Sequence, residues 1–484
     1  MEQKDKGYRN VSALYRDVFG EQPEIMSPLP SSGSNRQYFR LGGEGDTLIG
    51  AYNADLKENQ AFLSFSRTFS GQGLPVAGIH AESKDGLCYL LQDFGDLTLY
   101  GFLQSSRGTE SKFPENAIPV YKKVLSYLPR FQVGSEPDYS KSYPRPAFDR
   151  QSMLWDLNYF KYYFLKLAGI PFDEQRLEDD FLSFTSFLLQ ASSGYFMYRD
   201  FQSRNVMLQD EKVWFIDYQG GRRGALQYDV ASLLYDAKAD IPEEIREELL
   251  GFYLDSLSEH ISVDRPAFRK YYPGFVLIRI FQAMGAYGFR GFYEKKPHFL
   301  QSIPYALINL SKHCDQDFLH DLPELKKVIS LMINRKDLME FRKNSSSPVN
   351  NADLTISIHS FSYRNSFPPD STPNGGGFVF DCRSLPNPGR MQQFKLLSGK
   401  DREVIDFLMK EPEVESFLSG VFSLVDQSAD NYILRGFTHL MVCFGCTGGQ
   451  HRSVYCAETL GKHLREKYSL KVEVNHQELH SYPS

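Results

Sequence analysis

A polar segment about two thirds of the way along the chain most limits what this sequence can fold into. It runs from Arg342 to Asn351 and is rich in serine and asparagine, which favour neither a helix nor a buried strand. Amphipathic helical patterns precede it, and an alternating strand pattern at 354–358 follows it. Because 484 residues exceed one ordinary domain, we expect two domains, 1–341 and 353–484, joined by a linker at 342–352.

The composition indicates a folded globular chain and argues against several classes of protein. Hydrophobic residues make up 42% and charged residues 24%, and the net charge of −6 gives no general reason to bind nucleic acid or an anionic membrane. The N-terminus lacks the apolar core of a signal peptide and the sequence has no long apolar run, so we expect a cytoplasmic protein. The six cysteines are irregularly spaced, which argues against a disulfide framework, and Cys443 and Cys446 lack the second pair of a zinc site.

The first domain divides into a small strand-rich part and a larger helical part. Residues 31–100 contain strand patterns interrupted by one helical pattern at about 56–69, and residues 110–340 are mostly helical with a short hairpin near 205–217. The expected strands of the small part cover 37–41, 47–51 and 88–91. This order is typical of a bilobal, protein-kinase-like α+β fold.

Three polar side chains near the hairpin have the spacing that phosphoryl transfer requires. Asp200 and Asn205 form an Asp-x4-Asn pair, and Asp217 follows an apolar strand. A kinase needs a carboxylate beside the attacking hydroxyl and oxygen ligands that hold Mg²⁺ on the phosphates of ATP. We therefore predict Asp200 as the catalytic base and Asn205 and Asp217 as ligands of Mg²⁺. Each residue alone could be an ordinary loop residue, but their combined spacing is far more specific.

A loop of small residues in the first part, within 31–40, is the predicted phosphate-binding loop. Its backbone N–H groups can approach phosphates, although a plain β-turn has the same composition. Residues 90–96 end a strand with a glycine turn, where a kinase hinge would contact adenine through its backbone. The predicted nucleotide contacts are Ser32, Gly33, Ser34, Arg40, Gln92, Asp93 and Phe94.

The lysine that most kinases carry on a strand of the small lobe is missing, because Leu48–Tyr52 occupies that place. Arg40 is the candidate for a substitute contact to phosphate. Lys57 is nearby, but its place at a helix start favours a solvated side chain. We expect Glu58, on the same helix, to orient a basic partner.

Several motifs resemble those of the AmgK-type anomeric sugar kinases of the aminoglycoside phosphotransferase superfamily. They occur in order within residues 10–340, at 34–40, 90–96, 148–156, 198–205, 216–219, 228–236 and 282–290. Members of that family phosphorylate the anomeric hydroxyl of N-acetylmuramate or N-acetylglucosamine, so the resemblance implies an amino-sugar kinase that uses ATP and Mg²⁺. Tyr198 stands where the family usually has histidine. AmgK relatives also often lack the strand lysine, so its loss does not imply an inactive enzyme.

The sugar pocket has no sequence signal of its own. Asp229, Asp236 and Arg290 could face it, but Asp229 and Asp236 could equally be buried structural partners.

In the second domain a strand, a glycine-rich turn and a helix follow one another, at 437–445, 446–453 and 454–467. This order places backbone N–H groups, the helix dipole and Arg452 around one anion, which predicts a phosphate or sulfate site. Cys446 and Arg452 also match the C-x5-R-S spacing of cysteine phosphatases, in which a low-pKa thiolate is the nucleophile. A phosphatase would need a general acid, such as Asp381.

This block also resembles the C-terminal domain of RapZ, an RNase adapter of amino-sugar regulation. The matching segments are 360–364, 379–388, 398–401, 445–453 and 476–479. The resemblance implies a separate α/β domain that binds glucosamine-6-phosphate and a small RNA. The predicted phosphosugar contacts are Arg383, Cys446, Thr447, Gly448, Gly449, His451, Arg452 and Ser453. RNA binding is not favoured, because the basic tail of RNA-binding relatives is missing and residues 353–484 carry 13 Lys and Arg against 15 Asp and Glu, a net of −2.

The sequence is thus compatible with three functions. The first is an amino-sugar kinase fused to a phosphosugar-sensing domain, which both resemblances favour. The second is an RNA-binding regulator with a degenerate kinase lobe, against which the intact Asp200, Asn205 and Asp217 argue. The third is a bifunctional kinase and phosphatase that uses Cys446. Release of ADP from ATP, Mg²⁺ and a panel of sugars would distinguish them best.

Overall fold

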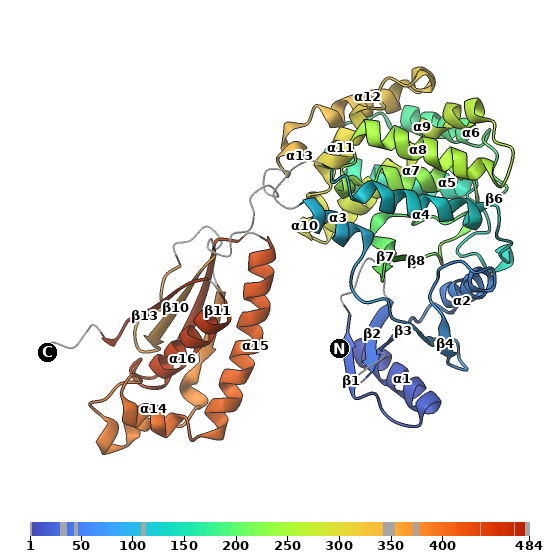
Figure 1. Cartoon of the computed structure of the whole chain (residues 1–484). Coiled ribbons are helices and arrows are strands. Elements are labelled where there is room, and N and C mark those ends of the chain that lie inside the picture. Colours follow the sequence, from blue (N-terminus) through green and yellow to red (C-terminus); the bar gives the residue numbers. More distant parts are fainter. Residues whose placement is uncertain are drawn as a thin grey trace. The chain divides into compact units, whose positions relative to one another are not determined.

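The computed structural model of the chain consists of two compact units, Met1–Arg342 and Lys343–Ser484 (Figure 1). The structure describes residues 2–29, 36–42, 47–107, 113–341, 354–370, 377–435, 437–468 and 470–479. The predicted linker at 342–352 and the predicted phosphate contacts Ser32, Gly33 and Ser34 lie outside the described residues.

The first unit begins with an antiparallel five-stranded sheet in the order β1-β2-β3-β5-β4. Its strands are β1 (Ile25–Pro28), β2 (Gln37–Gly42), β3 (Leu48–Tyr52), β4 (Ile79–Glu82) and β5 (Cys88–Gln92). Two helices accompany the sheet, α1 (Glu2–Phe19) and α2 (Leu56–Gly71) (Figure 1). Successive strand residues point to opposite faces, so Leu90 packs with Val11 of α1 whereas Tyr89 packs with Phe62 of α2.

Helix α2 is fixed at both its start and its middle. Asp55 caps it by accepting the backbone N–H groups of Lys57 and Glu58, as an N-cap aspartate does. Farther along, the ring of Phe62 stacks between Tyr89 and Tyr218, at centroid distances of 5.1 and 5.2 Å. Helix α2 therefore ties the sheet to the segment that immediately follows Asp217.

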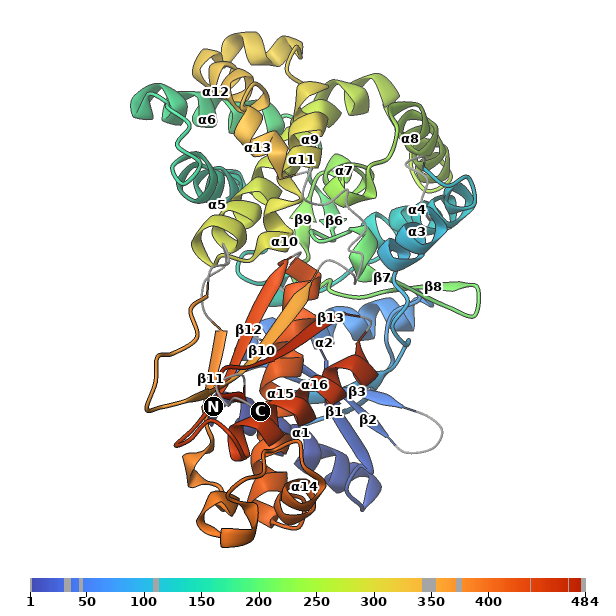
Figure 2. The same ribbon diagram turned by 90° about the vertical axis from the view of Figure 1, so that its left-hand side faces the viewer.

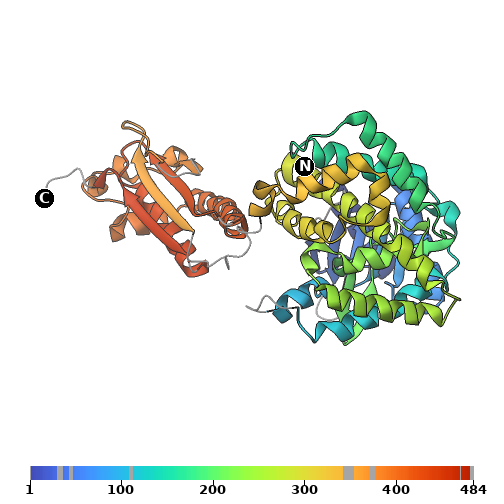
Figure 3. The ribbon, with the colours of Figure 1, turned by 90° about the horizontal axis from the view of Figure 1, so that it is seen from above.

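The second lobe is mostly helical (Figure 3). In its longest helix, α9, the residues from Gly274 to Phe281 are all buried. Its α-helices are α3 (Leu99–Arg107), α4 (Ala117–Gln132), α5 (Arg150–Phe160), α6 (Glu174–Leu188), α7 (Leu226–Leu234), α8 (Glu243–Ser258), α9 (Arg265–Tyr287), α10 (Pro297–Leu300), α11 (Ile303–Ser311), α12 (Pro323–Ile333) and α13 (Lys336–Glu340). In the part of the chain that the structure describes, no helix is long and apolar enough to cross a membrane.

This lobe also contains two short strand pairs. They are β6 (Tyr195–Met197) with β9 (Arg222–Gly224), and β7 (Val206–Gln209) with β8 (Lys212–Phe215). The second pair is the predicted hairpin. Asp210 and Glu211 form its turn, and both have a positive φ, which suits the twist of a two-residue hairpin loop. The hairpin register continues beyond the strands, where the N–H of Ile216 donates to the carbonyl of Asn205 at 3.1 Å. Residues before and after the hairpin are thereby brought together.

The second unit is a parallel four-stranded sheet, packed against helices, in the order β11-β12-β10-β13 (Figure 2). Its strands are β10 (Thr355–Ser362), β11 (Gly377–Asp381), β12 (His439–Cys446) and β13 (Lys471–His476), and its helices are α14 (Arg402–Leu408), α15 (Pro412–Arg435) and α16 (Arg452–Lys467). In this register Ser362 is adjacent to Cys446 at the carboxyl ends of β10 and β12. The predicted combination of a kinase-like fold and a separate α/β domain is confirmed.

Candidate functional site

The three residues predicted for phosphoryl transfer lie together at the end of the hairpin. Asn205 Nδ2 donates to Asp217 Oδ2 at 3.1 Å and to the backbone carbonyl of Asp200 at 2.8 Å. Burial and the negative charge of Asp200 raise the pKa of Asp217. The carboxylate of Asp217 and the amide oxygen of Asn205 are ligands of the kind that Mg²⁺ prefers, and a cation would also offset the repulsion between Asp217 and Asp200. The described residues therefore fit the predicted metal.

Two acidic residues, one in α7 and one just after it, hold the loop that carries Asp200. Asp229 accepts the backbone N–H groups of Tyr198, at 2.8 Å, and Arg199, at 3.0 Å. Asp236 accepts both the hydroxyl and the backbone N–H of Ser203. Asp229 and Asp236 are buried, so both are structural partners of the loop, which was one of the two roles that the sequence allowed.

The loop is also supported by α5, which carries Asp156. Arg199 has a φ of 82°, a rare conformation for a residue with a side chain, and its guanidinium makes two hydrogen bonds to Asp156 at 2.8 and 2.6 Å. Tyr198 is buried and donates its hydroxyl to the carbonyl of Ile216 at 2.6 Å. Tyr198 thus connects the loop of Asp200 to the residue preceding Asp217.

Arg40, the predicted contact to phosphate, is engaged by carboxylates. Its Nε donates to Asp93 at 2.6 Å, and its Nη2 donates to Asp96 at 2.9 Å. Asp93 also accepts the hydroxyl of Thr47. Arg40 and Asp93 therefore join β2 to the segment after β5, and their roles as nucleotide contacts stay predictions.

The remaining predicted nucleotide contacts follow or end β5. Gln92 is half-buried and its backbone N–H donates to the carbonyl of Gly78. Phe94 is buried and stacks on Trp214 of β8, with ring centroids 4.5 Å apart. Its side chain thus packs between the two lobes, and only its backbone suits the predicted adenine contact.

Sequence reasoning missed Arg36, which lies just before β2. Its side chain is buried, and its Nη2 is 3.4 Å from Oε1 of Glu58. Glu58 was expected to orient a basic partner, and Arg36 is that partner. The only sequence signal was the pair of arginines at 36 and 40, of which Arg40 was chosen.

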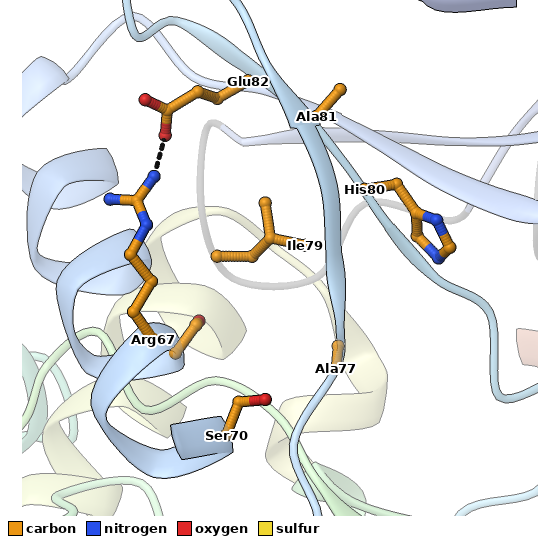
Figure 4. A pocket seen from close by; sticks show the side chains of 8 residues that line it. Arg67, Ser70, Ala77, Ile79, His80, Ala81 and Glu82 are labelled. Carbon is orange, nitrogen blue, oxygen red and sulfur yellow. Dashed lines mark hydrogen bonds and ion pairs between the residues drawn. The ribbon is translucent and has the colours of Figure 1, made fainter.

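A hollow of about 480 Å³ lies beside α2 and β4, away from these residues (Figure 4). Its lining includes Arg67 of α2 and Glu82 of β4, which form an exposed ion pair at 2.5 Å. None of the predicted nucleotide or metal contacts lines it.

In the second unit, the predicted anion site surrounds the junction of β12 and α16. Cys446 is the last residue of β12, and its sulfur accepts the N–H of Gly449 at 3.2 Å and lies 3.1 Å from the hydroxyl of Ser453. Helix α16 begins at Arg452, two residues earlier than predicted. Gly449 has a φ of 67°, which glycine adopts without strain. Apart from its chain neighbours, no atom of the described residues lies within 4 Å of the position that a Cβ of Gly448 would occupy, so a ligand could approach the backbone there.

Arg452 is buried and bound largely to the protein itself. Its Nη1 donates to the carbonyls of Arg383 and Leu385, and its Nη2 lies 3.4 Å from the hydroxyl of Thr447. His451 contacts the carbonyl of Phe394 through Nε2 at 2.8 Å. Arg452 therefore holds the backbone of the site in place in addition to contributing positive charge. The sequence spacing did not reveal this structural role.

Asp381 is poorly suited to act as the general acid that a phosphatase requires. Arg383 binds the Asp381 carboxylate at 2.6 Å and stacks over Tyr363. Hydrogen bonds from the Arg383 side chain lower the pKa of Asp381, whereas a general acid needs a raised pKa. Arg383 is half-exposed, so it lies at the edge of the predicted phosphosugar site.

The fold and the first site together define a phosphotransferase of the kinase-like class. The profile of the phosphotransferase enzyme family matches residues 25–270, and the chain belongs to that family. The profile of the RapZ C-terminal domain matches residues 354–480. A relative from Hahella chejuensis, described as a nucleotide-binding protein, is 38% identical over 127 residues, which are 26% of this chain and 42% of that protein. The chain thus spans less than half of that relative's length.

Solved structures of small-molecule kinases also resemble this chain at low sequence identity. Choline kinase LicA from Streptococcus pneumoniae is 12% identical with a TM-score of 0.43, over 64% of this chain and all of that one. A thermostable mutant of the aminoglycoside phosphotransferase APH(4)-Ia is 14% identical with a TM-score of 0.41, over 62% of this chain and 99% of that one.

Proposed function

We propose that residues 1–341 phosphorylate a hydroxyl of an amino sugar, the anomeric hydroxyl of an N-acetylated hexose, at the expense of ATP. The observation that carries this proposal is the convergence of Asp200, Asn205 and Asp217. Asp200 accepts the proton of the attacking hydroxyl, and Asn205 and Asp217 hold the metal. Mg²⁺, when bound, neutralises charge on the phosphates.

The position of Asp200 supports its role as a base. Its loop is anchored by Asp229 and by the Arg199–Asp156 bridge, so the carboxylate is held in place before substrate binds. Asp200 itself is half-buried and stays accessible to a hydroxyl. The amino sugar as substrate rests on the AmgK-type motifs and on the RapZ C-terminal domain, two sequence similarities that point to the same class of molecule.

The second unit is proposed to bind a phosphosugar such as glucosamine-6-phosphate without hydrolysing it. The support is the turn between Cys446 and Ser453, with its glycines and with Arg452 at the first turn of α16. The lowered pKa of Asp381 favours binding over phosphatase chemistry.

The kinase proposal is tested with the full-length protein, Mg²⁺·ATP and a panel of acceptors, with ADP release as the readout. N-Acetylglucosamine, N-acetylmuramate and related hexoses should release ADP, and kanamycin-like aminoglycosides should not. Asp200→Asn in the same assay shows that any ADP comes from this site. Turnover of aminoglycosides with none of the amino sugars would overturn the proposed substrate class.

A further inference from the structure

A buried cation, Arg36, lies just before β2 and beside α2. The guanidinium of Arg36 is 3% exposed as a residue, lies 5.8 Å from the ring centre of Phe62, and contacts Glu58 at 3.4 Å. Its Nη1 also donates to the hydroxyl of Tyr38 at 3.4 Å. Burial of a charge is costly unless the charge is paired and hydrogen-bonded, so a buried arginine in this place calls for a functional explanation.

Glu58 is itself fixed. It lies in the first turn of α2, which Asp55 caps, and its Oε2 accepts a hydrogen bond from Asn53 Nδ2 at 2.6 Å. The Glu58 carboxylate is therefore held in place and can keep the Arg36 side chain in one orientation.

Arg36 lies close to the segment that carries Asp217. Its guanidinium is next to the ring of Phe62, which stacks on Tyr218 at a centroid distance of 5.2 Å. Tyr218, the residue after Asp217, is tied to α2 through a 2.6 Å hydrogen bond with Ser66. Helix α2 therefore positions both Glu58 and the segment of Asp217.

The usual source of positive charge in a kinase is absent from β3. The strand reads Leu-Ile-Gly-Ala-Tyr and contains neither lysine nor arginine. Kinases of other classes place a lysine on the phosphates and hold it with a glutamate of the neighbouring helix. Arg40 is engaged by Asp93 and Asp96. Of Arg36 and Arg40, it is Arg36 that contacts a glutamate of the neighbouring helix, Glu58 of α2.

We propose that Arg36 contacts the phosphates of the nucleotide in place of the missing strand lysine and that Glu58 positions it. This inference rests on the proposed function, because it assigns a nucleotide contact in the same site. Arginine suits the role, since its planar fork can bind two phosphate oxygens at once and keeps its charge when buried. Glu58 acts through Arg36 and does not touch the nucleotide.

The experiment compares nucleotides that share adenosine and differ in their phosphates. Calorimetry with the full-length protein measures the affinities for Mg²⁺·ATP, Mg²⁺·ADP and adenosine in the wild type, Arg36→Ala, Arg36→Lys and Glu58→Gln. Arg36→Ala should weaken ATP and ADP binding roughly 10- to 100-fold, the range expected for a hydrogen bond to a charged group, and leave adenosine affinity unchanged. Arg36→Lys should recover part of the loss, and Glu58→Gln should lose less than Arg36→Ala.

Arg67→Ala is the matched control. Arg67 also pairs α2 with a glutamate, Glu82, but that pair is exposed and faces the hollow of Figure 4. This variant should bind all three nucleotides as the wild type does.

Two results would overturn the inference: equal ATP affinity in Arg36→Ala and the wild type, or an equal loss for adenosine and ATP, which indicates only a structural role. A wild type that binds no nucleotide would instead contradict the proposed function, so the two failures are distinguishable. Should Arg36→Ala not fold, Arg36→Lys and Glu58→Gln keep the test decisive, since both retain polar side chains of similar size.

Discussion

The carboxylate of Asp229 accepts the backbone N–H of Arg199, the residue before the predicted base, at 3.0 Å. Arg199 has a φ of 82°, and such a conformation costs of order 1–3 kcal/mol unless its surroundings compensate. Asp229 also accepts the N–H of Tyr198, and it is fully buried. The loop that presents Asp200 is thus held by a side chain that comes from a helix farther along the chain.

Removal of this support should destabilise the first unit. Asp229→Ala leaves two buried N–H groups without their acceptor, and we expect a loss of about 2–4 kcal/mol in the free energy of unfolding together with reduced turnover. Urea unfolding of the full-length protein measures the loss. Asp179→Ala removes an exposed aspartate of α6 and should cost far less. Equal midpoints for the two variants would contradict the anchoring role of Asp229.

Stability should also depend on pH through Asp229. Burial raises its pKa from 3.8 to about 7, so the folded state favours the neutral carboxyl more than the unfolded state does. Its stabilising contribution is complete below pH 4 and is lost as the pH rises toward 7. Relative to Asp229→Asn, which does not titrate, the wild type should lose up to about 1.4 kcal/mol per pH unit across that window. Urea unfolding of both proteins at several pH values measures it, and parallel curves would show that the pKa is not raised.

Asp200→Asn should lower turnover by about 10²- to 10⁴-fold, the usual contribution of a general base. Binding of Mg²⁺·ATP should be retained, because the substitution removes a charge without removing a hydrogen-bonding side chain. Steady-state kinetics and calorimetry measure the two quantities. Asp210→Asn, in the exposed turn of the neighbouring hairpin, should keep full activity. Full activity in Asp200→Asn would exclude it as the base.

Asp217→Asn should lose the Mg²⁺-dependent part of ATP binding. Asn is the informative substitution because Asp217 has a φ of 71°, which asparagine tolerates better than alanine. Neutralising one ligand weakens the hold on the metal that bridges the phosphates. A thermal-shift titration with ATP, with and without Mg²⁺, measures the effect. A Mg²⁺ dependence equal to that of the wild type would remove Asp217 from the metal site.

Arg452→Ala should affect both ligand binding and the stability of the second unit. The guanidinium holds the carbonyls of Arg383 and Leu385, so its loss should lower the unfolding free energy by about 1–3 kcal/mol. It should also weaken binding of glucosamine-6-phosphate by roughly 1.5–3 kcal/mol. Calorimetry on the full-length protein measures the binding, with Arg402→Ala, an exposed residue of α14, as the control.

A companion variant separates sensing from phosphatase chemistry. Cys446→Ser should bind the phosphosugar nearly as well as the wild type does, and neither protein should release phosphate from it. Phosphate release by the wild type that disappears in Cys446→Ser would show that the second unit is an enzyme.

The local patterns of the sequence were sufficient for much of the fold. Strand patterns predicted the strands at 37–41, 47–51 and 88–91, and the sequence also predicted the hairpin near 205–217. Because Asn205 and Asp217 flank that hairpin, their proximity also followed from the sequence. These features depend on neighbours within a few residues, and such interactions are already encoded in the order of the side chains.

The tertiary structure alone decided what the buried charges do. Arg36 and Arg40 lie four residues apart in one motif, and no local pattern distinguishes their roles. Arg40 binds Asp93 and Asp96, which follow β5, whereas Arg36 contacts Glu58 of α2. Asp229 and Arg452 likewise acquire their roles from backbone groups more than 25 residues away. Tertiary packing determines these partners, because it decides which groups distant in sequence lie together where water is excluded.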